Sequence, residues 1–210
     1  MDRRQFCKSS MLAAAWTLSP RPAWAESNLI QAASDALRKA GTNAALASLA
    51  GQERVMDPYR HYPSKPGIKD PKTGHSFFFH AHRSEEFGHF HTFSIDQYGA
   101  PIHVAMVSVN ERGLPTLLCT TNQWVTGTRY LPAKDMEAHI QGFSLHPSVY
   151  VQPDLVRFVT AVVHSHQREL MVLYKERDEW LDRYRLVHSK DPFKDTDHEV
   201  LSSIPLKVAT

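Results

Sequence analysis

The stretch FFFHAHRSEEFGHFHTF, residues 77–93, decides the fold, because two alternating runs flank a short charged turn that carries a glycine. Alternation with a period of two is typical of β-strands, and a short turn between two such runs predicts an antiparallel hairpin. We expect strands at residues 77–82 and 89–96, joined by the loop Arg83–Gly88. This hairpin holds four of the chain's 13 histidines.

The four histidines form two H-x-H pairs, His80 with His82 and His89 with His91. Residues i and i+2 of a strand point to the same face. A six-residue loop pairs His82 with His89 and His80 with His91, which places all four imidazoles on one face. A shift by one residue would instead separate the pairs. The hairpin therefore predicts a transition-metal site for zinc, copper or iron, and the alternative is a polar face of stacked histidines.

Two acidic residues, Glu85 and Glu86, lie in the turn between the histidine pairs. We expect one of them, with Glu86 as the catalytic candidate, to be the acid–base group or the carboxylate nearest to the metal. Three histidines with one vacant position would suit zinc hydrolysis or redox chemistry by copper or iron. The same ligands would also suit a metal-handling protein without turnover.

Two further alternating runs, residues 102–109 and 116–121, extend the hairpin to an antiparallel meander. The segment TNQWVTGTRY, residues 121–130, is a candidate for a fifth, edge strand. Helical spacing of apolar residues predicts helices at 28–50 with a break at Gly41 and a cap at Thr42 or Asn43, at 132–143, and at 153–186. The proline-rich residues 57–74 predict a loop or extended arm. The expected fold class is α+β, with the helices packed on one face of the sheet.

Several other polar residues are candidates for a pocket beside the histidines. They are Asn122, Gln123 and Trp124 in the TNQW segment, and His61 on the proline-rich arm. With them, the sheet face would bind a small molecule or a partner without catalysis, which is the alternative to a metalloprotein. The competing interpretation is a turn that Trp124 anchors to the core, with His61 at the surface. His164 and His166 are expected outside the site, because residues i and i+2 of a helix diverge by roughly 200°.

The motifs of this region resemble those of a family of uncharacterised bacterial proteins. The matching segments are DPYRHYP at 57–63, the histidine hairpin, and TTNQWVTG at 120–127. In that family the hairpin has the pattern Y-H-A-H-R, then E-H-G-H-F-H-T-F after a short gap, and Phe87 stands here in place of the histidine before the glycine. The resemblance covers roughly residues 55–130. It implies that the hairpin histidines matter, and it implies no particular activity.

The N-terminus has the pattern of an export signal. The string DRRQFCK, residues 2–8, resembles a twin-arginine signal, and Ala23-Trp24-Ala25 has the A-x-A form of a cleavage site. We expect a signal at residues 1–25 and a single domain at 26–210, exported already folded to the periplasm or outside the cell. No stable membrane insertion is expected after cleavage. An ordinary secretory signal or a short membrane anchor is the alternative.

Charge and cysteine content narrow the possible partners. Residues 1–25 hold four of the 24 Lys and Arg and one of the 22 Asp and Glu, so the remaining chain has a formal charge of −1. A nucleic-acid partner would call for a basic face, and none is expected. Cys119 is the single cysteine outside the signal, and its apolar surroundings predict a buried thiol rather than a ligand.

Overall fold

The computed structural model describes the backbone of residues 23–207 and the side chains of residues 28–207. The predicted twin-arginine string lies outside the described residues, and the predicted cleavage site coincides with the start of helix α1 (Ala23–Lys39). Among the helices of the described region, none has both the length and the apolar character needed to cross a bilayer.

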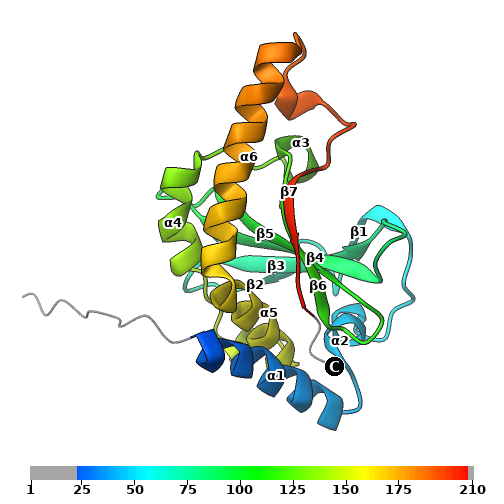
Figure 1. Cartoon of the computed structure of the whole chain (residues 1–210). Coiled ribbons are helices and arrows are strands. Elements are labelled where there is room, and N and C mark those ends of the chain that lie inside the picture. The colour runs from blue at the N-terminus through cyan, green and yellow to red at the C-terminus, as the bar shows by residue number, and fades with distance from the viewer. Residues whose placement is uncertain (1–22, 208–210) are drawn as a thin grey trace, which may run out of the picture.

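The centre of the molecule is a seven-stranded antiparallel sheet (Figure 1). The strand order is β1-β3-β4-β5-β6-β7, and the short β2 pairs with β3. The strands are β1 (Asp57–Tyr62), β2 (Ile68–Lys69), β3 (Ser76–Ala81), β4 (Gly88–Ile95), β5 (Pro101–Val109), β6 (Pro115–Thr121) and β7 (Val200–Pro205). The predicted meander is confirmed as β3 to β6. The prediction of a strand-free arm at 57–74 is wrong, since this segment supplies β1 and β2.

The α+β class is confirmed, and most helices begin and end near the predicted residues. Besides α1 they are α2 (Ala44–Leu49), α3 (Gln123–Thr126), α4 (Ala133–Gln141), α5 (Pro153–Ser165) and α6 (Gln167–Val187). Gly41 has a φ of 74°, which suits a glycine between α1 and α2. The Asn43 side chain caps α2 by accepting a bond from the amide of Leu46.

The predicted long helix at 153–186 is divided at His166. There the backbone leaves the helical region, with φ −122° and ψ 27°. The imidazole Nδ1 of His166 lies 2.8 Å from the carbonyl oxygen of Val162, which the amide of residue 166 would bond in a continuous helix. The side chain thus replaces the amide at this carbonyl, and the chain starts a new helix, α6.

The predicted edge strand at 121–130 is instead a single turn of helix, α3. The Asn122 side chain accepts a bond from the Gln123 amide at 2.7 Å, and Gly127 ends the turn with a φ of 65°. A short polar side chain that bonds its neighbouring backbone favours a capped turn over a strand ladder, which explains the difference.

The main hydrophobic core lies between one face of the sheet and the helices. Buried side chains on this face include Phe77, Phe79 and Phe90, and they share one cluster with residues of α5 and α6 such as Phe158 and Leu170. Figure 1 shows α4, α5 and α6 gathered on one side of the sheet. The predicted packing of helices against one face is therefore confirmed.

The opposite face is buried because the sheet curls over it. His82, just after β3, and Glu199, just before β7, approach to 3.6 Å although three strands lie between β3 and β7. Met106 and Cys119 stand on this face in register with His91, and all three are fully buried. The concave face of the sheet thus forms a second interior, and this interior contains the histidines.

Candidate metal site

The predicted pairing of the hairpin histidines is wrong by two residues. In the structure His80 pairs with His89, and Phe78 pairs with His91. The loop comprises residues 82–87 rather than 83–88, and Gly88 already belongs to β4. A Cβ atom on Gly88 would lie 2.3 Å from the ring of Phe79 and 2.7 Å from a backbone oxygen, so only glycine fits this close approach. Because the shift is even, the paired histidines stay on one face.

The four imidazoles form two triangles that share the pair His80 and His89. The ring centroids of this pair are 4.3 Å apart, and His82 lies 4.8 and 5.0 Å from them. His91 completes the second triangle, and its ring centroid lies 4.9 Å from that of His80 and from that of His89. The ligand nitrogens of His80, His82 and His89 all lie within 4.8 Å of one another, so this group could hold a metal ion.

Hydrogen bonds orient the rings of His80 and His89. The Nδ1 atom of His80 lies 3.0 Å from the carbonyl oxygen of Pro58, which can only accept a hydrogen bond. The Nδ1 atom of His89 is bonded to a carboxylate oxygen of Glu86. Such bonds place the proton on Nδ1 and leave a lone pair on Nε2, which is the usual arrangement for histidines that bind metals.

His91 is oriented by another histidine. Its Nδ1 atom lies 2.9 Å from Nε2 of His103 on β5, and the Nδ1 atom of His103 lies 3.4 Å from the hydroxyl of Thr121. His91 and His103 are buried. The chain His91–His103–Thr121 thus crosses β4, β5 and β6 on the concave face.

Three buried nitrogens of the cluster have no hydrogen-bond partner: Nε2 of His80, of His89 and of His91. Buried polar atoms without a partner are rare in folded proteins, because each carries the cost of lost hydration. Their concentration on one pair of strands fits the donor set of a metal ion.

Burial favours the uncharged form of His80, His82 and His91. It lowers the pKa of His80 to about 2, with the neighbouring His89 adding to the effect. Burial also lowers the pKa of His91 well below its ordinary value and lowers the pKa of His82. Neutral imidazole is the form that binds a metal, so these side chains offer lone pairs at physiological pH.

Glu86 lies behind the imidazole of His89, on the side away from Nε2. Its side chain is only 4% exposed. Burial is the largest influence and alone would raise the pKa of its carboxyl, but the bond to His89, together with the charges of His89 and Arg83 and other contacts, lowers the pKa overall. Glu86 is therefore a carboxylate that orients His89, and its role as the catalytic acid–base group stays a prediction.

The outer side of the cluster is formed by His82 and two charged residues. The His82 side chain is 16% exposed, and its Nε2 lies 3.6 Å from a carboxylate oxygen of Glu199. Arg83 lies 3.8 Å from the same oxygen. The site thus opens toward solvent past His82, whereas His91 closes it on the inside.

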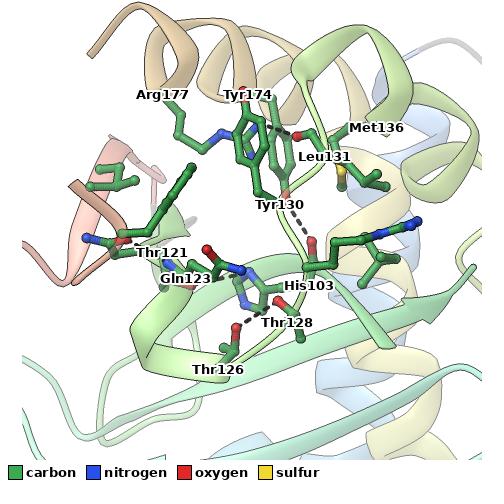
Figure 2. A pocket seen from close by; sticks show the side chains of 15 residues that line it. His103, Thr121, Gln123, Thr126, Thr128, Tyr130, Leu131, Met136, Tyr174 and Arg177 are labelled. Atoms are coloured by element: carbon green, nitrogen blue, oxygen red, sulfur yellow. Dashed lines mark hydrogen bonds between the residues drawn. The ribbon is translucent and has the colours of Figure 1, made fainter. Parts of the chain in front are cut away.

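The predicted pocket residues divide between two places. Gln123 lines a small cavity behind His103, together with the hydroxyls of Thr126 and Thr128, as Figure 2 shows. The cavity has a volume of ≈ 30 Å³, which holds only a few water molecules. Asn122 also borders it but is fully buried and bonded to three backbone carbonyl oxygens.

The other two predicted pocket residues lie elsewhere. Trp124 is 39% exposed, and its indole nitrogen donates a bond to the carbonyl of His198 at 3.2 Å. His61 stacks on Phe78 at 3.9 Å and lies 5.7 Å from the ring of His80. His61 therefore lies beside the cluster, in contact with Phe78 and His80.

The helix histidines lie apart from the cluster. His164 Nε2 lies 2.5 Å from the carbonyl oxygen of Phe143, and His166 bonds the carbonyl oxygen of Val162 in α5. Cys119 is buried as predicted, and burial raises the pKa of its thiol to about 12. Sequence reasoning missed His103 and Glu199, because neither belongs to an H-x-H pair and only the curl of the sheet brings Glu199 to the histidines.

The family described as a domain of unknown function (DUF6969) matches residues 24–206. No curated protein and no solved structure matches.

Proposed function

The chain therefore belongs to the family DUF6969, and from the geometry of its concave face we propose that it binds one transition-metal ion through the histidine hairpin. His80, His82 and His89 would supply Nε2 atoms, and His91 lies beneath them as the inner neighbour. The observation that carries this proposal is the group of ligand nitrogens of His80, His82 and His89, which lie within 4.8 Å of one another. Within this group the buried Nε2 atoms of His80 and His89 have no hydrogen-bond partner. A metal ion would satisfy these atoms and would keep the rings neutral.

The donor set narrows the choice of ion. Neutral imidazoles suit zinc, copper and iron, whereas calcium and magnesium prefer oxygen ligands. A bound ion of this kind would supply Lewis-acid or redox chemistry to a small-molecule substrate. In that case Glu86 would hold the ring of His89, and His103 would hold the ring of His91. The solvent side at His82 would admit the substrate.

The alternative is a binding module that holds a small molecule without a metal. The cavity behind His103 does not favour it, since ≈ 30 Å³ is at least about tenfold smaller than a typical ligand pocket of roughly 300–1,000 Å³. It also leaves the unpartnered imidazole nitrogens without an explanation.

The test is the metal content of untagged protein, purified without chelators and measured by elemental mass spectrometry. We expect about one zinc, copper or iron per chain. We expect His89→Ala to lose it, because His89 belongs to both histidine triangles. The matched control is His164→Ala, which removes a half-buried imidazole away from the hairpin. Wild-type protein without stoichiometric metal, also after incubation with each ion, would overturn the proposal in favour of the binding module.

A further inference from the structure

The carboxylate of Glu199 is the acidic group on the open side of the histidine cluster. One of its oxygens, Oε1, is buried and has no hydrogen-bond partner. That oxygen lies 3.6 Å from Nε2 of His82, which is too long for a hydrogen bond. Glu199 therefore brings a buried, unsatisfied anionic oxygen to the same place as the unsatisfied imidazole nitrogens.

The separation fits two ligands of one metal. Zinc binds imidazole nitrogen and carboxylate oxygen at about 2.0–2.2 Å, so two such donors at a tetrahedral angle lie about 3.4 Å apart. The observed 3.6 Å between His82 and Glu199 is close to this spacing. Glu199 lies outside the group of His80, His82 and His89 whose ligand nitrogens are within 4.8 Å of one another, so its carboxylate would move toward His80 and His89 when an ion binds.

Arg83 does not satisfy the carboxylate in place of a metal. Its Nη1 lies 3.8 Å from Oε1 of Glu199, and its Nε is itself buried without a hydrogen-bond partner. Its Nε also lies 3.9 Å from Glu86. These distances exceed those of a hydrogen-bonded ion pair, so Glu199 keeps a free lone pair beside His82.

The fold holds Glu199 in this position through the TNQW segment. The amide of Asn122 donates to the carbonyl of Glu199 at 2.8 Å. The Asn122 side-chain nitrogen lies 2.8, 3.4 and 3.0 Å from the carbonyl oxygens of Pro192, Asp195 and His198. Trp124 bonds the carbonyl of His198 as well. The chain before β7 is thus fixed to the end of β6, and Glu199 follows directly from it.

We propose that Glu199 is the fourth metal ligand, completing a site with His80, His82 and His89. The inference rests on the proposed function and gives the metal a specific coordination by three imidazoles and one carboxylate. The carboxylate belongs to the residue just before β7. The inference assigns the TNQW segment the task of positioning that carboxylate. The carboxylate also offsets one of the two positive charges of a divalent ion, which neutral imidazoles do not.

The experiment is a titration of the apo-protein with Co²⁺, followed by its visible absorption bands, in wild type, Glu199→Gln and Glu85→Gln. The matched control, Glu85, is an exposed carboxylate in the hairpin loop. We expect Glu199→Gln to weaken Co²⁺ binding about tenfold or more and to alter the band positions, and Glu85→Gln to match wild type. Unfolding of each apo-protein by heat should be unchanged.

The outcomes separate the two proposals. If wild type binds no Co²⁺ and no zinc, the proposed metal site itself fails. If wild type binds Co²⁺ and Glu199→Gln does so with the same affinity and spectrum, only the assignment of Glu199 is overturned. Should Glu199→Gln not fold, X-ray absorption of zinc-loaded wild type decides: three imidazoles and one carboxylate support Glu199, whereas three imidazoles with a water, or four imidazoles, overturn its assignment.

Discussion

At the scale of single residues, the hydrogen bond at Nδ1 of an imidazole determines whether its Nε2 atom has a lone pair for a metal ion. His80 and His89 each have Nδ1 committed to an oxygen acceptor, so their Nε2 atoms are turned toward the shared space. The period of two predicted that the four histidines share a face, and this survives the shift in register because the shift is even. The partners at Nδ1 were not predictable except for Glu86, because Pro58 and His103 come from other strands.

Glu86 offers a test of this orienting role. We expect Glu86→Ala to lower metal affinity by about 10–100-fold, since the imidazole of His89 loses the group that fixes its tautomer and direction. Glu86→Gln should lose less, because an amide oxygen still accepts the bond from Nδ1. The measurement is competition for Zn²⁺ against a chelator dye, with Glu85→Gln as control. Equal affinity in all variants would show that Glu86 does not act through His89.

The carboxylate of Asp70, which lies away from the histidine cluster, leads to a prediction of how the stability of the protein depends on pH. This carboxylate is buried and accepts bonds from the amides of His146, Lys72 and Thr73, and these bonds lower its pKa below 3.8. The charged form is thus favoured by folding, so its contribution is complete above pH 3.8 and is lost as the pH falls through the lower folded value.

We expect Asp70→Asn to reduce the free energy of unfolding by about 1–3 kcal/mol at pH 7, since one amide oxygen replaces two carboxylate oxygens. The difference from wild type should shrink as the pH falls below 3.8. Urea unfolding at pH 7, 4 and 3 measures this. A difference that stays constant with pH would contradict the assignment to the Asp70 carboxylate.

At the scale of elements, local patterns predicted strands and helices well where no distant partner intervenes. β3 to β6 and the capped α2 follow directly from periodicity and capping residues. The break at His166 and the helical turn at α3 were missed, because each depends on one side chain that bonds the nearby backbone. The strands β1 and β2 were missed because the prolines of residues 57–74 are typical of a loop, although β1 is an edge strand, where proline is tolerated.

Asn122 links α3 to the segment before β7. We expect Asn122→Ala to lower the free energy of unfolding by about 2–4 kcal/mol, because the bonds to three carbonyl oxygens and the cap of α3 are lost from a buried position. Metal affinity should fall as well, since the segment before Glu199 is then held only by the backbone bond of residue 122 and by Trp124. Urea unfolding and Co²⁺ titration measure the two effects, with Gln123→Ala as control. If Asn122→Ala loses stability but keeps its metal affinity, Asn122 does not position Glu199 for metal binding.

At the scale of the whole molecule, the proposed site depends on parts that are far apart in the sequence. The histidines come from β3, β4 and the loop between them, whereas Glu199 precedes the last strand and reaches them only when the sheet has curled. No local pattern carries this information, because the approach is a consequence of sheet topology. A site of this kind is complete only after the entire domain has folded.

Because the site forms only in the folded domain, the route of export determines whether the metal can bind before the chain crosses the membrane. We propose that the chain is exported folded, with the metal already bound, through the twin-arginine signal at residues 2–8. Replacing Arg3 and Arg4 with Lys should stop export, and the wild-type protein outside the cytoplasm should begin near Glu26, as N-terminal sequencing would show.

Cell fractionation compares the location of the wild-type protein with that of the variant in which Arg3 and Arg4 are replaced with Lys. A periplasmic marker protein with an ordinary secretory signal is the control. If the Lys variant is exported as well as wild type, the chain crosses the membrane unfolded, and the site must acquire its metal outside. If Met1 is retained on a membrane-bound form, the segment is an anchor. The order of folding and transport then decides where the metal enters, because the carboxylate and the histidines meet only in the folded domain.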